Sequence, residues 1–390
     1  MSAAYVLAAV RTPGCKAKKG KLRDVRPDDL AATAIRALVE RAGIEPREIE
    51  DVILGCAFPE GEQGMNLGRV AALRAGLPVE VPGQTVNRFC ASGLQTIATA
   101  AERILAGQAD CIVAGGAESM SLVPMGGARF SANPALVASW PESFAAMGIT
   151  AELVAARDGV SREDQDAFAA ASHARAAAAQ AAGSFADELV PVEVERAAIV
   201  KGKVQRSTER VAEDDGVRPD TTVEALARLK PAFKLDGTVT AGNASQMTDG
   251  AAAALVVSEA FLARTRIAPL ARFVSYAVRG VAPELMGIGP IAAIPAALAR
   301  AGVRAQDVGH VELNEAFAAQ ALACVRALDL DPARVNPMGG AIALGHPLGC
   351  TGAKLTATLL HGMRRSGVRH GVVSMCIGGG MGAAAVFERV

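Results

Sequence analysis

The chain has 390 residues, of which 51% are hydrophobic and 21% are charged, and its 40 Lys and Arg residues balance its 40 Asp and Glu residues. A chain of this length is expected to form two or three units that each bury a core, and its balanced charge excludes a long-range field that would attract nucleic acid or an anionic membrane. Its longest apolar runs, such as residues 372–377, are too short to span a bilayer.

The N-terminus lacks a basic leader before its apolar run at residues 5–10, so we interpret that run as a first strand and not as a signal peptide. The seven cysteines are odd in number, lie far apart and never form the close pairs of a zinc site. We therefore expect a cytoplasmic protein with free thiols, no disulfides and no bound metal.

An internal repeat is the strongest structural signal. The first copy has apolar residues at helical spacing between residues 30 and 39, a helix-ending Gly43 and an apolar strand at residues 52–54. The Arg-Ala-Gly pattern of residues 41–43 recurs at residues 300–302, again before an apolar strand. The same offset relates Ser-Gly at 92–93 to Thr-Gly at 351–352, each predicted to open a long helix that leads to a strand ending in glycines. The sequence thus predicts a duplicated domain of β/α units.

The stretch between the two halves, from about residue 120 to 240, differs in composition. It contains an Ala-rich helix predicted from Ser161 to Ala182, with Ser161 as N-cap and Gly183 as C-cap, and it ends in a charged, turn-rich segment. We interpret it as an insertion that covers one face of the duplicated core.

Cys90 is predicted to lie at a strand-to-helix turn, because it follows an apolar segment at residues 85–89 and precedes an Ala-rich helix that runs to about Leu105. The unpaired N–H groups of a helix N-terminus lower the pKa of a thiol and can bind an oxyanion. A nucleophile is one use of this position, and a small buried cysteine packed under the helix is the alternative.

Three further residues mark strand ends and a glycine-rich turn. The repeat places His346 three residues before Gly349, the counterpart of Cys90, so that base and thiol are predicted to meet. Asn314 follows the second repeat strand, where open α/β sheets place their sites. Cys376 precedes a run of glycines, which fits a core thiol or a dinucleotide phosphate loop equally well.

Four segments, residues 86–93, 314–317, 339–352 and 376–382, resemble the four signature blocks of the thiolases, and the resemblance extends from residue 10 to the C-terminus. It implies an α/β thiolase fold, with a duplicated αβαβα five-layered core and an inserted loop domain. The N-terminal half would comprise residues 1–119 plus 244–268, the loop domain that binds coenzyme A residues 120–243, and the C-terminal half residues 269–390.

The resemblance also implies a mechanism. His346 would activate Cys90, which would attack a 3-ketoacyl-CoA and keep the acyl group until a second coenzyme A removes it, while Cys376 would act as general acid and base. Asn314, through a water, and His346 would form one oxyanion hole, and the N–H groups of Cys90 and Gly378 the other. Coenzyme A and acyl-CoA are substrates here, and no permanently bound cofactor is expected.

Substrate contacts follow from the same match, which implies that Arg218, Ser245, Ala241, Met147, Phe317 and Met247 bind the coenzyme A thioester. Two positions depart from the best-known biosynthetic members, since Ala146 stands where they carry a histidine and Ala225 where they carry a serine. A homodimer or homotetramer is expected.

Residues 336–340 and 345–352 resemble the degradative 3-ketoacyl-CoA thiolases more closely, whereas the catalytic residues alone also fit a short-chain acetoacetyl-CoA thiolase that works biosynthetically. A decarboxylating ketoacyl synthase shares the core fold but has no second catalytic cysteine. A non-catalytic thiolase-like carrier of acyl-CoA or lipid is the alternative from another class. Acyl chain length and physiological direction stay open.

Overall fold

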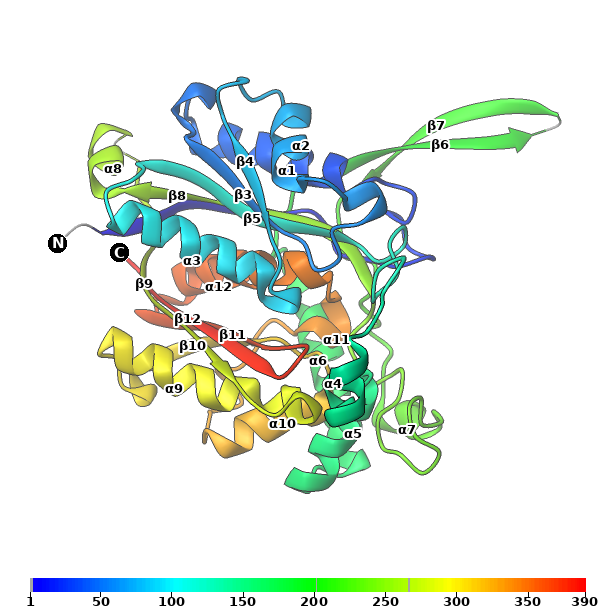
Figure 1. The fold of residues 1–390 in the computed structure, drawn as a ribbon. Coiled ribbons are helices and arrows are strands. Elements are labelled where there is room, and N and C mark those ends of the chain that lie inside the picture. The colour runs from blue at the N-terminus through cyan, green and yellow to red at the C-terminus, as the bar shows by residue number, and fades with distance from the viewer. Residues whose placement is uncertain (1–2, 201, 266) are drawn as a thin grey trace.

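Helices and sheets alternate in five layers, which run from top to bottom in Figure 1. The structure, a computed structural model, describes residues 3–200, 202–265 and 267–390. The outer helices are α1 (Pro27–Ala42) and α2 (Leu67–Ala75) on one side and α9 (Gly289–Ala301) and α10 (Ala318–Ala327) on the other, and the central helices are α3 (Ser92–Leu105) and α12 (Leu348–Ser366). The expected αβαβα layering is therefore confirmed.

A large mixed sheet runs through both halves in the order β10-β11-β12-β9-β1-β8-β5-β3-β4, and the halves join where the first residues of β1 pair with β9. The strands are β1 (Ala4–Arg11), β2 (Cys15–Lys16), β3 (Asp51–Gly55), β4 (Gly83–Val86), β5 (Cys111–Ser119), β8 (Thr248–Ser258), β9 (Ala271–Gly280), β10 (Val308–Leu313), β11 (His370–Ile377) and β12 (Met381–Glu388). Helices cover both faces of each half, which explains why strands such as β5 and β8 are buried along their whole length.

The duplicated units are present as predicted. Helix α1 ends at Gly43 before β3, and α9 ends at Gly302 before β10; both glycines are left-handed. One detail of the prediction was wrong, because β5 does not end at its glycines but continues to Ser119. A Cβ on Gly115 would clash with the carbonyl of Ala252 in β8, and a Cβ on Gly116 would clash with that of Gly349 in α12, so these glycines permit close packing within the sheet and of α12 against it.

The two central helices cross closely at their N-terminal turns. A Cβ on Gly93 would meet the backbone nitrogen of Ala353, and a Cβ on Gly352 would meet that of Leu94. The glycines thus allow α3 and α12 to approach with their first turns in contact, within the core cluster between the sheet halves. Because Cys90 and His346 precede these helices, the crossing brings the two side chains to one place.

The inserted segment supplies most of the remaining elements. These are α4 (Pro134–Ser139), α5 (Met147–Asp158), α6 (Arg162–Ala181), the hairpin of β6 (Val192–Val200) and β7 (Lys203–Val211), and α7 (Val223–Ala227), whereas α8 (Glu259–Thr265) and α11 (Ala341–Leu344) lie outside it. The predicted Ala-rich helix is confirmed as α6, where Ser161 caps the first turn by accepting a hydrogen bond from the N–H of Asp164 (3.1 Å). Gly183 follows the helix in a left-handed conformation, after Ala182 as the C-cap.

The hairpin corrects the expectation of a charged, turn-rich segment. Strands β6 and β7 project from the body in Figure 1. Val192 and Val194 alternate with Glu193 and Glu195, and among the hairpin side chains that the structure describes only the valines at its base are buried. This alternation was a strand signal, but the charged residues around it obscured it.

Among the described residues, the stretch Pro283–Ala301 is long and apolar enough by composition to cross a membrane. It has a non-helical residue at Leu285, and α9, its longer part, packs against β9 and β12. That packing in the core of the C-terminal half accounts for its apolar character.

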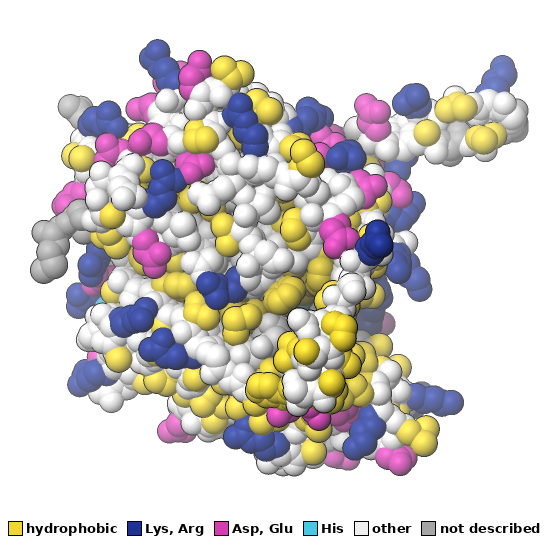
Figure 2. Space-filling model, viewed as in Figure 1, with side chains coloured by type: hydrophobic (Ala, Val, Ile, Leu, Met, Phe, Trp, Pro, Cys, Tyr) yellow, Lys and Arg dark blue, Asp and Glu magenta, His cyan; other side chains and the backbone are white. Residues whose placement is uncertain are grey.

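Apolar side chains gather on the face that carries α4 (Figure 2). The exposed members on and beside this helix are Phe130, Leu136, Val137, Trp140 and Phe144. The segment also contains Met125 and Ala146, which line the cavity described next, so the patch lies at the cavity's border.

Candidate active site

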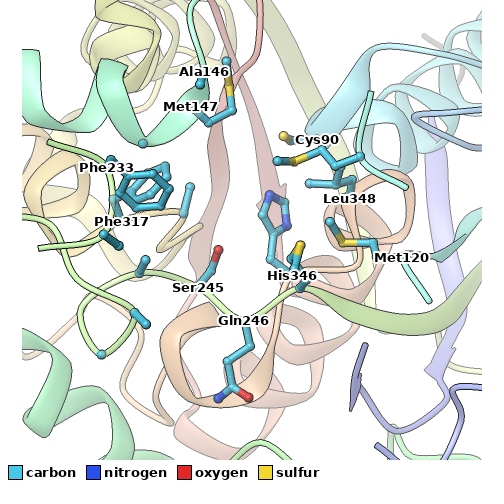
Figure 3. A pocket seen from close by; sticks show the side chains of 18 of the residues that line it. Cys90, Met120, Ala146, Met147, Phe233, Ser245, Gln246, Phe317, His346 and Leu348 are labelled. Atoms are coloured by element: carbon cyan, nitrogen blue, oxygen red, sulfur yellow. The ribbon is translucent and has the colours of Figure 1, made fainter. Parts of the chain in front are cut away.

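A cavity of about 500 Å³ lies between the duplicated core and the inserted segment. Figure 3 shows Cys90 and His346 on one side of it and Phe233 and Phe317 on the other. The sequence-predicted residues that line it are Cys90, Met147, Arg218, Ala241, Ser245, Met247, Phe317, His346 and Cys376. Asn314 and Gly378 lie directly behind this lining, each in contact with a residue that forms it. The structure thus brings all the predicted site residues together.

Cys90 lies on a strained turn between β4 and α3. Phe89 before it has a φ of 44°, which costs a residue other than glycine of the order of 1–3 kcal/mol. Asn87 and Ser92 hold this turn: the N–H of Phe89 donates to Asn87 Oδ1 (2.8 Å), and Ser92 Oγ donates to the carbonyl of Phe89 (2.6 Å). The turn leaves Cys90 partly exposed to the cavity.

The thiol of Cys90 keeps its proton. Burial raises the pKa of this thiol to about 11, although hydrogen bonds from the backbone N–H groups of Gly378 and of Cys90 itself lower it. The backbone donors thus lower this pKa as expected, but the expectation of a lowered net value is wrong, because desolvation outweighs the two donors. A base is needed to form the thiolate.

His346 lines the same cavity and is the predicted base. Its Nδ1 lies 2.6 Å from Thr351 Oγ1, and that hydroxyl also donates its single hydrogen to the carbonyl of Pro347 (2.9 Å). A hydroxyl that donates elsewhere can only accept from the ring, so Nδ1 carries the proton and Nε2 is the unprotonated nitrogen. Burial lowers the pKa of His346 to about 3, with a further contribution from Lys354, so the ring is neutral and able to take a proton.

The side-chain amide of Asn314 donates a hydrogen bond to this unprotonated nitrogen. Its Nδ2 is 3.3 Å from His346 Nε2, and its side chain is fully buried. Its Oδ1 is buried and has no hydrogen-bond partner among the described residues. Buried amide oxygens are rarely left unpaired, so this atom is free to accept from a water or a substrate.

Cys376 lies at the end of β11 and is almost completely buried. Burial raises the pKa of its thiol well above the ordinary value, and the neighbouring Cys90 and Cys324 raise it further. The thiol therefore stays protonated and can donate a proton within the cavity.

Two buried carboxylates hold the loops around the site. Glu118 accepts hydrogen bonds from the N–H groups of Ala57 and Gly349, both at 2.7 Å. Glu315 accepts from Ser172 of α6 (2.7 Å) and from Asn336 (2.9 Å). The first ties the first turn of α12 to the N-terminal half, and the second ties the inserted segment to the C-terminal half.

The rim of the cavity is positively charged. Lys16 and Arg218 line it, and the pKa of Lys16 is lowered by burial and then by the nearby charges of Arg218 and Lys19. These cations could meet an anionic ligand locally although the net charge of the chain is zero. Sequence reasoning missed Lys16, and the lysine-rich run at residues 16–21 was the available signal.

The apolar wall was also missed in part. Its unpredicted members are Met120, Met125, Leu229, Phe233, Met286 and Leu348. They come from loops and helices far apart in the sequence, and a single methionine or leucine carries no local signal of a binding site. Phe233 and Phe317 meet edge to face, with ring centroids 6.0 Å apart.

The model of the thiolase N-terminal domain matches residues 4–260, and that of the thiolase C-terminal domain matches residues 267–389. The chain belongs to the thiolase family. It is therefore an acyltransferase of the class that uses coenzyme A thioesters. This assignment also identifies the five-layered core as a thiolase fold and argues against a ketoacyl synthase.

Named relatives agree with this assignment over the whole chain. The 3-ketoacyl-CoA thiolase of Bacillus subtilis is 55% identical, with 100% of both chains covered. The peroxisomal 3-ketoacyl-CoA thiolase of Homo sapiens is 46% identical over 97% of this chain and 89% of its own. The crystal structure of an acetyl-CoA acetyltransferase from Bacillus anthracis superposes with a TM-score of 0.91 at 40% identity, covering 100% of this chain and 99% of that one. These are enzymes, which disfavours the carrier alternative.

Proposed function

We propose that this thiolase cleaves 3-ketoacyl-CoA with free coenzyme A, giving acetyl-CoA and a shortened acyl-CoA, and that it also catalyses the reverse condensation. One observation carries the proposal: an accessible thiol, a neutral imidazole and a buried protonated thiol meet in one cavity, as Cys90, His346 and Cys376. These three groups suffice for a nucleophile, a base and an acid.

In the first half-reaction, Cys90 Sγ attacks the 3-keto carbon while His346 Nε2 takes the thiol proton. The tetrahedral oxyanion collapses, the bond between C2 and C3 breaks, and its electron pair leaves on an acetyl-CoA enolate. Cys376 donates its proton to C2 of the enolate. The products are acetyl-CoA and an acyl thioester on Cys90.

In the second half-reaction, the thiol of free coenzyme A returns a proton to Cys376 and its sulfur attacks the acyl carbon. The bond to Cys90 breaks, and Cys90 recovers its proton from His346. The N–H groups of Cys90 and Gly378 serve as one oxyanion hole, and Asn314 with His346 as the other. The buried, unpaired Oδ1 of Asn314 supports a bound water at the second hole.

Coenzyme A is proposed to enter along the rim. Lys16, Lys19 and Arg218 would face its phosphates, and Ala241, Ser245 and Met247 would follow the pantetheine arm. Met147 and Phe317, which also line the cavity, would lie close to the reacting thioester. We keep the division into residues 1–119 plus 244–268, 120–243 and 269–390, since the inserted part supplies Arg218 and Met147 to the cavity wall.

A degradative role is supported by the printed names of the relatives and by the cavity wall. Five methionines line the cavity, namely Met120, Met125, Met147, Met247 and Met286. Their unbranched side chains repack easily and can fit acyl chains of different lengths. The exposed apolar patch around α4 borders the same cavity and could receive a longer chain.

A thiolysis assay tests the proposed function. With free coenzyme A and 3-ketoacyl-CoAs of short, medium and long chain, we expect kcat/KM for at least one longer substrate to exceed that for acetoacetyl-CoA by about tenfold or more. Turnover of acetoacetyl-CoA alone would assign a short-chain thiolase instead. Binding without turnover of any substrate would refute the proposal and restore the carrier alternative.

Thr351 is expected to fix the tautomer of His346. Thr351→Val keeps the shape of the side chain but removes the acceptor for Nδ1–H, so we expect kcat to fall roughly 10- to 100-fold with little change in KM. Thr351→Ser restores the hydroxyl and should recover most of the loss. Steady-state thiolysis of the two variants checks this, and equal activity of both would contradict the role.

The assembly expected from the resemblance and the compartment expected from the N-terminus and the cysteines are both proposals. A homodimer or homotetramer is supported by β4, an edge strand of the sheet, and by the exposed apolar side chains on and beside the adjacent helix α2. These are Met65, Val70, Leu73 and Val79.

All seven cysteines are free thiols, which supports a reducing compartment such as the cytoplasm.

A further inference from the structure

A lysine ammonium group is buried beneath the turn that carries His346. Lys354 lies in the second turn of α12 and is 3% exposed. Its Nζ donates to the carbonyl of Leu344 (2.7 Å) and to that of Gly345 (2.8 Å), the two residues directly before His346. Helical side chains lean toward the helix N-terminus, which is why Lys354 reaches back past the start of α12 to this turn.

The turn needs such a donor. The short helix α11 ends at Leu344, so its last carbonyls have no partner within the helix. Gly345 then adopts a φ of 81°, and a Cβ there would collide with Thr248. A cationic side chain that binds the last carbonyls of a helix fixes the exit direction of the chain. Here that direction sets where the ring of His346 points.

We infer that Lys354 is a positioning residue of this thiolase, which holds the turn before His346 and keeps its ring in the neutral, proton-accepting form. This inference rests on the proposed role of His346 as the base. Lys354 does not line the cavity and touches neither Cys90 nor the substrate site, so its effect passes through His346.

The charges around Lys354 explain how it stays buried. Two carboxylates of the inserted segment, Glu188 and Asp214, face it, and Arg11 of β1 binds both of them, Glu188 at 2.6 Å and Asp214 at 2.7 Å. Two cations thus meet two anions without contact with solvent. The charge of Lys354 also acts on Glu312 of β10, which pairs with His310, and on Cys350, which lies on α12 like Lys354.

The charge of Lys354 supports its role in keeping the ring of His346 neutral. Burial lowers the pKa of Lys354 to about 8, so the group is charged at neutral pH and at the acidic pH at which His346 would gain a proton. Its positive charge adds to burial in lowering the pKa of His346. Above pH 8 the neutral amine still has two N–H groups for the two carbonyls, so the turn is held while only the charge is lost.

Two variants separate the contacts from the charge. Lys354→Met removes both, and we expect kcat to fall roughly 10- to 100-fold with KM nearly unchanged, because the base is misplaced. In a profile of kcat/KM against pH, the acid limb should move to higher pH, since one of the two causes that lower the pKa of His346 is gone. Lys354→Gln keeps an amide donor without the charge and should retain more of kcat while showing the same shift of the acid limb.

Thr358→Val is the matched control. Thr358 lies one helical turn further along α12 and donates to Glu188 (2.9 Å), so it touches the same buried charges but not the turn before His346. It should lower the unfolding temperature while leaving kcat and the acid limb as in the wild type. An equal shift of the acid limb in this variant would overturn the inference, as would a wild-type kcat and acid limb in Lys354→Met.

Nitrogen NMR of histidine-labelled protein reads the state of His346 without turnover. We expect the wild-type ring to remain the neutral Nδ1–H form under mildly acidic conditions and to titrate at higher pH in Lys354→Gln, the variant more certain to fold. An unchanged titration would overturn the electrostatic role. Because this readout needs no substrate, inactivity of the wild type toward all thioesters would refute the proposed function without deciding the role of Lys354.

Discussion

Cys90→Ala is expected to lower the rate of thiolysis by at least about 10⁴-fold, because no other accessible thiol can take over the covalent step. The remaining cavity thiol, Cys376, is buried at the end of β11, and its pKa is raised well above the ordinary value. The variant should still bind acyl-CoA, since alanine only removes one sulfur from the wall. Steady-state thiolysis and equilibrium binding of an acyl-CoA measure the two properties separately.

Mass spectrometry adds a direct observation of the intermediate. Wild-type protein incubated with acetyl-CoA alone should gain the mass of one acetyl group on the peptide that contains Cys90, and Cys90→Ala should gain none. Cys350→Ala is the matched control, since it also replaces a thiol by alanine. Cys350 is buried in the first turn of α12 and does not line the cavity. Acetylation of a different cysteine in the wild type would assign the nucleophile elsewhere.

The core of the fold was predictable because the chain contains it twice. The helix that ends at Gly43 and the helix that ends at Gly302 carry the same local signals, and each is followed by a strand. Local rules of helix termination and hydrophobic periodicity act over a few residues and are therefore visible in sequence. The pairing of β1 with β9 joins residues far apart in the chain and has no such signal.

The residues of the site also fall into those that local sequence signals predicted and those that only the folded structure shows. Cys90, His346 and Cys376 lie beside strand ends, glycines and helix starts, so the neighbouring residues indicated that these positions lie at a site. The resemblance to thiolases then implied their roles. Thr351 and Lys354 were not predicted, because both lie inside α12 and act through contacts with residues that precede the helix. The folded geometry alone decides to which acceptor a hydroxyl donates its hydrogen and which carbonyls a lysine reaches.

The protonation state of Cys90 shows the limit of reasoning from local structure. A thiol before a helix is expected to have a lowered pKa, yet burial raises the pKa of Cys90 to about 11 against two backbone donors. Desolvation depends on everything that surrounds the thiol, including the inserted segment. The consequence for the proposed mechanism is that Cys90 needs a base before it can act as a nucleophile.

Cys376→Ala is expected to divide the catalytic cycle in two. The variant lacks the acid that protonates the enolate, so thiolysis should fall about 10²- to 10⁴-fold, the usual contribution of general acid catalysis. Exchange of labelled coenzyme A into acetyl-CoA breaks no carbon–carbon bond and needs only Cys90 and His346, which passes the proton between the two thiols. That exchange should stay within about tenfold of the wild-type rate, whereas Cys90→Ala should abolish it.

Cys324→Ala is the control for this prediction. Cys324 is a buried thiol that helps to raise the pKa of Cys376 but does not line the cavity. It should leave both thiolysis and exchange unchanged. Release of label from the methyl group of acetyl-CoA into water provides a third readout, which the wild type should show and Cys376→Ala should lose. If Cys376→Ala lost exchange and thiolysis equally, Cys376 would support the position of Cys90 and would not be the acid, and another group would have to protonate the enolate.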